Sequence, residues 1–415
     1  MSDKIIGKQD KAYKEYILSK IDEFNSNGKR TVVHFCDTYY PVIDGVIKVV
    51  ENYAKTMCEK FNVVVVVPKH KGTTVTEKTD FLVIGAKGHY FKFVNYDLGF
   101  PKFDGFLKKV FKRLRVDLIH GHSPFTMGSF ASKKAKKLKV PYLMTLHSQY
   151  KRDFMRYTKS EKLSSFLLRC IMRVFKRSDE VWTMHNFSRQ IIKDYGYKGN
   201  VYLMPNATDF HPKSDPETLT ALADEKFNFI KDVPVFLFVG RLVEQKNLRF
   251  IVSALKIVKE KGLNFKMVFI GDGPDKNMLL KHIEHCGLTD FVLLAGRIDD
   301  VEILSACYAK ASLFLFPSVY DTSSLVQIEA SALYTPSVLL KDTATAQTVT
   351  DGVNGFISDH TPEAFAEKII YALSDKERLE KISSNAHNDL YITWEKLGER
   401  IEERYNYLID NVKKK

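Results

Sequence analysis

The chain alternates short β-branched runs with amphipathic segments along almost its whole length, and this alternation limits the fold more than any other feature. It is typical of parallel sheets whose strands are joined by crossover helices. Strand candidates in the first half lie at 31–35, 63–67, 81–84, 117–121, 142–146, 180–183 and 201–204. Those in the second half lie at 235–239, 266–270, 291–294, 312–316 and 337–340. We therefore expect an α/β fold in which each half forms its own doubly wound sheet.

A segment rich in proline and turn formers separates the two sets of strands. It runs from Pro205 to Pro216 and contains three prolines in twelve residues, which disfavours helix and strand alike. We take it as an interdomain linker, and we expect domains at 1–205 and 206–390. The remainder, 391–415, is expected to be a helix that packs back on the first domain, and another helix should precede the first strand.

Ligands of doubly wound sheets bind beyond the carboxyl ends of the strands. Two Rossmann-like domains that face each other would therefore enclose a central cleft, which is where we expect the functional site.

The sequence lacks the apolar segments that a membrane span or a secretory signal needs. Uninterrupted apolar stretches such as Val63 to Val67 are far shorter than the roughly 20 residues that cross a bilayer. The charged start, Met1 to Lys14, has no apolar core. The five scattered cysteines form no C-x-x-C pair, and we expect reduced, mostly buried thiols. These features predict a cytoplasmic protein.

Two strand ends in the second half carry glycine-rich turns. The strand at 235–239 runs into Gly240 and Arg241, with Lys246 close behind. A glycine lets the chain turn tightly, and the two cations would suit a diphosphate, although plain surface charge is an equally good interpretation at this point. Gly271 to Pro274 is more simply a tight turn before a helix.

A third strand end is more specific. Ser323 and Ser324, before Leu325, suit the start of a helix whose free N–H groups and positive dipole end attract anions. Asp321 lies just before this helix start and Glu329 lies further along the helix, where carboxylates can accept hydrogen bonds from sugar hydroxyls. Cations, a helix start and carboxylates together suit a sugar attached to a nucleoside diphosphate.

At these residues the chain resembles glycosyltransferase family 4, a family of retaining, metal-independent enzymes with the two-domain GT-B fold. The similar segments occur in the family's order over residues 30–375. They are the Gly-bearing loop Phe35–Val46, the H-x-H-x-P segment His120–Pro124, the T-x-H segment Thr145–His147, the junction Pro205–Asp209, the G-R-L…K segment Gly240–Lys246 and the E-x7-E segment Asp321–Glu329. The last of these is also similar to the same segment in bacterial glycolipid-type members.

The resemblance implies a role for each matched residue. Catalytic roles fall on Arg241 and Lys246, which would stabilise the leaving diphosphate, and on His147 and Asp321 beside the transferred hexose. Donor binding falls on Gly45, Gly240, Ser323, Ser324, Leu325 and Glu329, with Glu329 on the ribose and Gly45 admitting the diphosphate.

Two departures from the family pattern leave the hexose open. The first motif carboxylate is Asp321 instead of Glu, and Ser323-Ser324 replaces the usual bulky residue and glycine. No D-x-D cluster follows a strand, so we expect neither a metal nor another cofactor, and the cations would neutralise the leaving group. We expect a same-face displacement in which the leaving phosphate helps to deprotonate the acceptor.

Two histidines near the end of one strand are further candidates. His120 and His122 alternate on this strand, and we expect them to face opposite sides, which makes a shared metal unfavourable. His122 is the better candidate for the cleft because Ser123 and Pro124 follow it. For His147, a hydrogen-bonded histidine at a strand end is the simpler alternative.

Charge is distributed unevenly between the halves. Residues 1–200 hold 38 Lys and Arg against 19 Asp and Glu, a formal charge of +19, whereas the rest carries −6. Two apolar stripes at helical spacing occur there, most simply packed on the sheet: Phe103, Phe106, Leu107, Val110, Phe111 and Leu114, then Leu163, Phe166, Leu167, Cys170, Ile171, Val174 and Phe175. Basic residues beside an anionic leaflet contribute about 1 kcal/mol each, so a dozen would hold the chain on a membrane.

The sequence therefore predicts a hexosyltransferase that uses UDP-glucose or a related UDP-sugar. The acceptor is expected to be a membrane lipid such as diacylglycerol or a lipid-linked glycan, at the cytoplasmic membrane face. A soluble sugar acceptor and a nucleotide-sugar epimerase remain alternatives. A nucleic-acid partner is not expected, because neither interleaved exposed aromatics nor a base-reading motif accompanies the cations.

Overall fold

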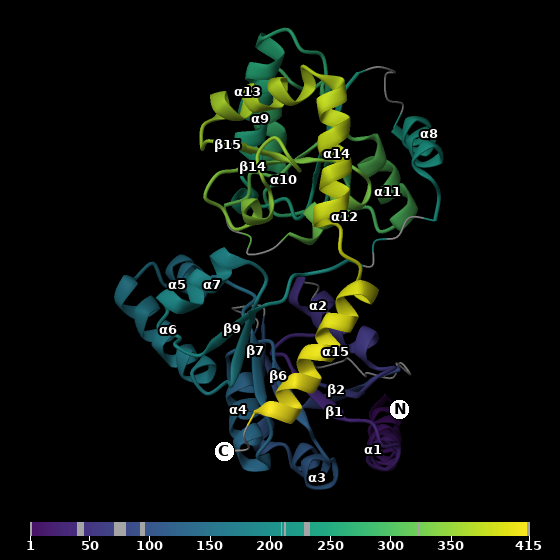
Figure 1. Ribbon diagram of the computed structural model, residues 1–415, viewed down its shortest axis with the longest axis vertical. Helices are drawn as coiled ribbons and strands as arrows, with labels where there is room; N and C mark the ends of the chain where they lie inside the picture. Colours follow the sequence, from purple (N-terminus) through teal and green to yellow (C-terminus); the bar gives the residue numbers. More distant parts are fainter. Residues whose placement is uncertain are drawn as a thin grey trace. The chain divides into compact units, whose positions relative to one another are not determined.

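A computed structural model describes residues 2–39, 45–69, 80–91, 96–208, 210, 213–227, 233–319, 321 and 324–412, with backbone alone at 2–10, 90–91 and 96–97. The chain divides into two compact units (Figure 1). The first comprises Met1–Pro205 with Trp394–Lys415, and the second comprises Asn206–Thr393.

The first unit is built on a parallel sheet of seven strands in the order β3-β2-β1-β6-β7-β8-β9. The order in which successive strands are added reverses between β1 and β6, and in such folds the ligand crevice lies at the carboxyl ends of the two strands at this point. The strands are β1 (Thr31–Phe35), β2 (Asn62–Pro68), β3 (Leu82–Ala86), β6 (Leu118–Gly121), β7 (Tyr142–Thr145), β8 (Glu180–Thr183) and β9 (Asn200–Leu203). β1 and β2 are buried at every position, as expected for strands covered on both faces.

Helices cover this first sheet (Figure 1). They are α1 (Ser2–Ser26), α2 (Gly45–Met57), η1 (Pro101–Phe103), α3 (Gly105–Arg113), α4 (Thr126–Leu138), α5 (Tyr150–Thr158), α6 (Glu161–Phe175), α7 (Asn186–Asp194) and α15 (Trp394–Asn411). The added helix α1 buries Ile17 and Ile21 in the core of this unit. The sequence missed the antiparallel pair β4 (Gly88–Phe91) and β5 (Tyr96–Gly99).

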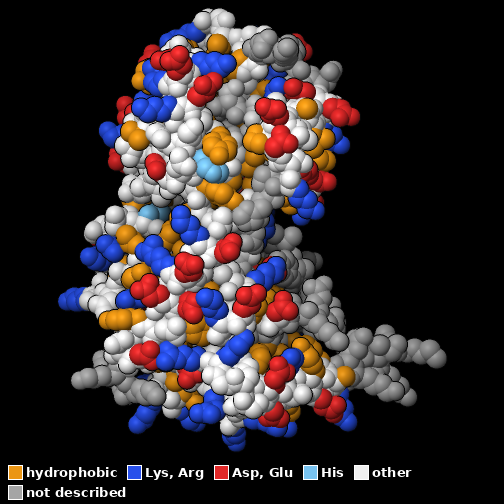
Figure 2. Space-filling view, turned by 45° about the vertical axis from the view of Figure 1, so that its right-hand side comes forward, with side chains coloured by type: hydrophobic (Ala, Val, Ile, Leu, Met, Phe, Trp, Pro, Cys, Tyr) orange, Lys and Arg blue, Asp and Glu red, His pale blue; other side chains and the backbone are white. Residues whose placement is uncertain are grey.

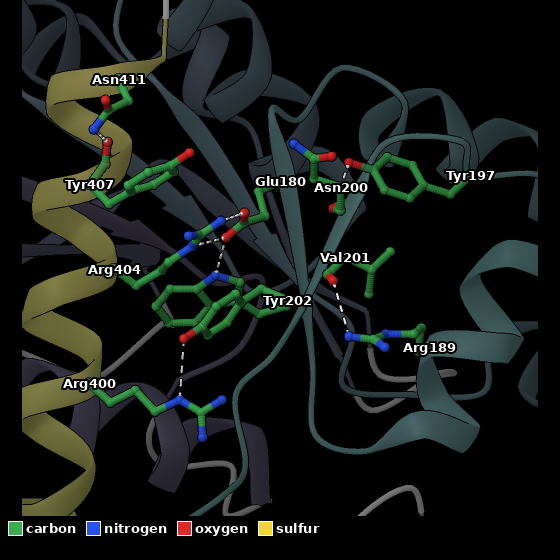
Figure 3. A network of polar contacts seen from close by, with 11 residues as sticks. Glu180, Arg189, Tyr197, Asn200, Val201, Tyr202, Arg400, Arg404, Tyr407 and Asn411 are labelled. Atoms are coloured by element: carbon green, nitrogen blue, oxygen red, sulfur yellow. Dashed lines mark hydrogen bonds and ion pairs between the residues drawn. The ribbon is translucent and has the colours of Figure 1, made fainter.

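The C-terminal helix α15 packs within the first unit through a buried carboxylate (Figure 3). Arg404 donates to both oxygens of Glu180, with Nε 2.9 Å from Oε1, and the Trp182 indole donates to the same oxygen at 2.8 Å. The Glu180 side chain is only 2% exposed. A bidentate guanidinium therefore compensates the burial of this negative charge.

We expect Arg404→Ala to lower the free energy of unfolding by about 3 kcal/mol, because removing one partner strands a buried charge. The matched control is Arg30→Ala, which breaks a solvent-exposed pair with Asp410 on the same helix and should cost less than about 1 kcal/mol. Chemical denaturation of both variants measures the difference. Equal losses would show that the Glu180 pair does not anchor α15.

The second unit has a parallel sheet of six strands in the order β12-β11-β10-β13-β14-β15, with the reversal between β10 and β13. Its strands are β10 (Val235–Val239), β11 (Lys266–Ile270), β12 (Val292–Gly296), β13 (Leu313–Leu315), β14 (Ser337–Leu340) and β15 (Phe356–Ser358). Its helices are α8 (Pro216–Phe227), η2 (Glu244–Lys246), α9 (Leu248–Glu260), α10 (Lys276–His285), α11 (Val301–Lys310), α12 (Leu325–Ala332), η3 (Thr345–Thr348), α13 (Pro362–Leu373) and α14 (Lys376–Leu390). The sequence missed β15, which has three residues.

The linker between the two units is shorter than the segment 205–216 predicted from the sequence. The boundary between the units falls after Pro205, but Thr208 already pairs with Thr393 in the second unit, and its amide donates to Ile392 O at 3.0 Å. Asp215 then binds the backbone amides of Glu217 and Thr218 at the start of α8. Much of the proline-rich segment is therefore part of the second unit.

Two further findings concern the composition. None of the described helices is both long and apolar enough to cross a bilayer. All five cysteines are free, but only Cys36 and Cys307 are buried. The expectation of mostly buried thiols is therefore wrong for Cys58, Cys170 and Cys286, which are partly exposed.

Candidate functional site

The turn after β10 packs directly against the turn after β11. The Gly240 amide donates to Ile270 O at 2.9 Å, and Gly240 has φ +153° and Gly271 φ +136°, which favour glycine. A Cβ added to Gly271 would lie 1.9 Å from Gly240 O, and one on Gly273 would lie 2.2 Å from Leu242 O. The glycines at 271 and 273 are therefore needed for close backbone packing, which favours the interpretation of Gly271 to Pro274 as a tight turn.

The structure brings Lys246 and Asp321 together, although 75 positions separate them in the sequence. Lys246 Nζ lies 2.5 and 2.6 Å from the two carboxylate oxygens, and each side chain is 19% exposed. The ammonium also lies 5.2 Å from the ring centroid of Phe316, at the end of β13. Asn247 fixes this corner by donating to Pro317 O at 2.8 Å. A cation and a carboxylate thus share one partly enclosed position beyond the reversal point of the sheet.

Helix α12 begins next to this ion pair in sequence. Ser324 is its N-cap, and the Ser324 side chain accepts a hydrogen bond from the Gln327 amide at 3.3 Å. The serine hydroxyl therefore serves the helix, while the N–H groups of the first turn, from Leu325 onward, are the groups that a helix leaves for external acceptors. The predicted residue Ser323 lies outside the described residues, as does Asp209 of the junction segment.

Glu329 has a partner that the sequence did not indicate. The Tyr308 hydroxyl, on α11, donates to Glu329 Oε2 at 3.0 Å. Tyr308 is fully buried, and burial together with the nearby carboxylate raises the pKa of Tyr308 well above its ordinary value. The phenol therefore stays protonated and orients the carboxylate. Only the fold brings these two helices together, so no local pattern could have revealed this contact.

Arg241 differs from Lys246 in its surroundings. Its side chain is exposed, and within the described part of the chain the structure gives it no ion pair. It follows Gly240 directly, so it stands at the carboxyl end of β10, close in sequence to Lys246. Among the described residues, therefore, this guanidinium has no ion-pair partner that it must leave before it binds a ligand.

Gly45 is the first residue of α2 in the first unit. A Cβ added to Gly45 would meet no described atom within 4 Å. Packing among the described residues therefore does not require a glycine at this position. The preceding loop residues 40–44 of the Gly-bearing segment lie outside the described residues.

The expectation that His120 and His122 face opposite sides of their strand is wrong. Residues two apart on a strand share a face, and the two ring centroids lie 4.0 Å apart. Both rings are buried together with His34 from β1. His120 binds Tyr405 Oη and Thr145 Oγ1, both at 2.7 Å. Because its two ring nitrogens are engaged, the cluster does not support a metal site.

A chain of buried histidines leads to the predicted site residue His147. His34 Nδ1 lies 2.9 Å from His122 Nε2, and His122 Nδ1 lies 3.1 Å from His147 Nε2. Burial lowers the pKa of His34 to about 3 and that of His147 to about 4, so the rings are neutral. His34 Nε2 has no partner among the described atoms. Since a buried lone pair is tolerated better than a buried N–H, Nδ1 of His34 carries the proton and each ring donates toward His147.

We expect the free energy of unfolding to fall as the pH is lowered below about 6.5, since the unfolded chain then binds protons that the buried histidines refuse. Burial lowers the pKa of His120 and His122 as well, and each of the four rings contributes up to about 1.4 kcal/mol per pH unit. Asp37 and Asp153, whose pKa burial raises to about 6, act in the opposite direction. Urea unfolding near neutral and near mildly acidic pH measures the balance. A constant free energy would contradict it.

Two family descriptions match the chain, one in each half. Residues 43–211 match Glycosyltransferase Family 4. Residues 221–389 match Glycosyl transferases group 1. The first segment contains Gly45, His120, His122 and His147, and the second contains the Lys246–Asp321 ion pair and helix α12.

Among curated proteins, the chain is 27% identical over 288 residues to an alpha-monoglucosyldiacylglycerol synthase of Acholeplasma laidlawii, covering 66% of this chain and 71% of that protein. It is 26% identical over 312 residues to the enzyme of the same name from Streptococcus pneumoniae, covering 73% and 69%. Among solved structures, Anabaena HepE in complex with UDP superposes with a TM-score of 0.73 at 18% identity, covering 91% of this chain and 99% of that one.

The fold and the family matches agree with one another. Two Rossmann-like units with parallel sheets are the architecture of GT-B glycosyltransferases, and the resemblance seen in the sequence is confirmed at the level of family and fold. The chain therefore belongs to the glycosyltransferases, with a Glycosyltransferase Family 4 domain in its first half and a Glycosyl transferases group 1 domain in its second half.

Proposed function

We propose that this glycosyltransferase transfers a hexose from UDP-glucose or a related UDP-sugar to a membrane lipid such as diacylglycerol or a lipid-linked glycan. The observation that supports the donor half of the proposal is the position of Lys246 Nζ, within 2.6 Å of both oxygens of Asp321, a residue that lies just before the N-cap of α12 in the sequence. The names of two relatives, both monoglucosyldiacylglycerol synthases, support the lipid acceptor. HepE, solved with UDP, supports the nucleotide.

We assign each predicted donor-binding residue to one part of the nucleotide sugar. Arg241 and Lys246 would neutralise the diphosphate oxygens, and the amide end of α12, at Ser324 and Leu325, would add fixed dipoles. Asp321 would accept a hydrogen bond from a hexose hydroxyl. Glu329, oriented by Tyr308, would accept one from the ribose.

Lys246 would change partner when the donor binds. In the described structure its charge is balanced by Asp321 alone. A diphosphate would bring further negative charge to the same ammonium, and the hexose hydroxyls would supply hydrogen bonds to the carboxylate. Donor binding and formation of the reactive arrangement would thus be coupled through one ion pair.

The transfer step breaks the bond between the anomeric carbon and the diphosphate oxygen and forms a bond from the same carbon to the acceptor oxygen. With retention, the acceptor attacks from the face that the diphosphate leaves. The acceptor's hydroxyl proton passes to the departing phosphate oxygen, so charge and atoms balance without a metal. His147 is neutral and is hydrogen-bonded to His122, and it would donate a hydrogen bond near the transferred sugar.

The acceptor is tested by incubating the enzyme with several nucleotide sugars and with either diacylglycerol vesicles or soluble sugar acceptors, followed by mass spectrometry. A hexosylated lipid is the expected product. A hexosylated soluble sugar alone would replace the lipid with a soluble acceptor. Isomerised nucleotide sugar formed without any acceptor would indicate an epimerase.

The membrane part of the proposal rests on charge. Residues 1–200 carry a formal charge of +19, and Figure 2 shows Lys and Arg side chains on one face of the first unit, interspersed with Asp and Glu and with apolar side chains. We expect the protein to pellet with anionic vesicles at low salt and to be released as salt rises, because surface attraction is screened over about 10 Å at 0.1 M salt. Zwitterionic vesicles are the control. Equal pelleting with both kinds would contradict electrostatic attachment.

A further inference from the structure

An apolar groove of about 950 Å³ lies on the first unit, along one face of helix α4. The α4 residues that line it recur every three or four positions, from Thr126 to Lys137, so the groove follows the helix axis. The segment Leu98–Phe103, which includes η1, and helix α6 also line the groove. Apolar side chains dominate the lining, among them Phe100, Phe130, Leu167, Ile171 and Val174.

The two apolar stripes predicted from the sequence pack only in part, and residues of both line the groove. Leu107, Val110 and Phe111 are buried as expected, but Phe103 is 67% exposed. On α6, Phe166 is 54% exposed, next to the lining residue Leu167. The expectation that both stripes pack on the sheet is therefore wrong at Phe103 and Phe166. Exposed phenylalanines beside an apolar groove are typical of a surface that meets an apolar partner.

The charges at the groove are all of one sign. Lys102, Lys133, Lys134 and Lys137 line it, and no Asp or Glu occurs among the described lining residues. Lys134 Nζ lies 4.8 Å from the ring centroid of Phe111 and 5.4 Å from that of Phe130, so its stem covers apolar surface. An occupant that is largely apolar and carries a negative charge therefore suits the groove.

We propose that this groove binds an anionic phospholipid, with one acyl chain between η1 and α6 and the phosphate beside Lys133 and Lys137. A phospholipid fits both the apolar lining and the positive charge of the groove, whereas a neutral hydrocarbon would leave the lysines without a role. The proposal goes beyond a charged membrane surface, because it names a binding site for a single lipid. It depends on the proposed function only for the presence of a membrane.

A native cysteine makes the site testable. Cys170 lines the groove and is partly exposed. Cys58 is also partly exposed and lies in the same unit, but it is not among the groove's lining residues. The rates at which N-ethylmaleimide labels these two thiols can be followed by mass spectrometry in the full chain. The ratio of the two rates reports occupancy of the groove and cancels general effects of an additive.

The probe is dihexanoyl phosphatidylglycerol kept below its critical micelle concentration, so that no membrane shields the surface. At a lipid concentration of ten times Kd, labelling of Cys170 should slow about tenfold while Cys58 is unchanged. Dihexanoyl phosphatidylcholine should protect less, and glycerol phosphate, which has no chains, should not protect. Unchanged labelling of Cys170, equal protection by glycerol phosphate, or equal slowing of Cys58 would each overturn the site.

Charge reversal provides the matched variants. Lys133→Glu with Lys137→Glu should abolish the preference for phosphatidylglycerol over phosphatidylcholine. Lys108→Glu with Lys109→Glu makes the same charge change on α3, outside the groove, and should keep the preference. Loss of the preference in both pairs would overturn the role of the groove lysines. Labelling requires no sugar transfer, so a negative result here leaves the proposed reaction standing, and a failure of the reaction leaves the lipid site standing.

Discussion

Lys246→Ala is expected to lower kcat for sugar transfer by about 100- to 1,000-fold, the effect of removing one well-placed donor to developing charge. The loss has two causes. The variant removes the ammonium that would face the leaving diphosphate, and it leaves the partly enclosed Asp321 carboxylate without its cation. That carboxylate would then repel the diphosphate. Initial rates at saturating donor measure the effect.

The two causes can be separated with neighbouring variants. Asp321→Asn keeps the ammonium and removes the repulsion, and the double variant Lys246→Met with Asp321→Asn removes both charges. We expect the double variant to regain thermal stability relative to Lys246→Ala, but not to regain kcat. A double variant with nearly normal kcat would show that the ammonium has no part in the reaction.

Arg241→Ala is expected to lower kcat by about 100-fold and to change the free energy of unfolding by less than about 0.5 kcal/mol. Arg241 is exposed and has no ion pair among the described residues, so its loss does not disturb the folded chain. The control is Arg249→Ala, which removes an exposed guanidinium eight positions away that pairs with Glu244. Its kcat should be close to that of the wild type. Equal losses in both variants would point to general surface charge instead of a placed cation.

The fold follows closely from local pattern. β1, β8, β10, β11 and β14 begin and end where the sequence predicts, because each is a short, mostly buried β-branched or aromatic run between turn formers. The strands that were not predicted give a weaker signal. β15 has only two apolar residues, and β4 and β5 mix aromatic residues with glycine, histidine and aspartate.

The site could be predicted only where residues lie within one motif. Gly240, Arg241 and Lys246 follow one strand, Asp321 and Glu329 belong to one segment around a helix start, and the resemblance to a family added Gly45 and His147. Contacts between residues far apart in the sequence were not predicted. They include the contact of His122 with His34 on the neighbouring strand and that of Glu329 with Tyr308 on another helix. The error over His120 and His122 came from assigning the wrong face to positions two apart, and the structure corrects it.

The proposed mechanism requires the two cations and the amide end of α12 to bind the departing diphosphate. Titration calorimetry with UDP and with uridine, on the wild type and on the variant with both Arg241→Ala and Lys246→Ala, tests it most directly. We expect UDP to bind the wild type more tightly than uridine does, and the double variant to lose this difference while its affinity for uridine is unchanged. A double variant that still prefers UDP to the same extent would contradict the claim.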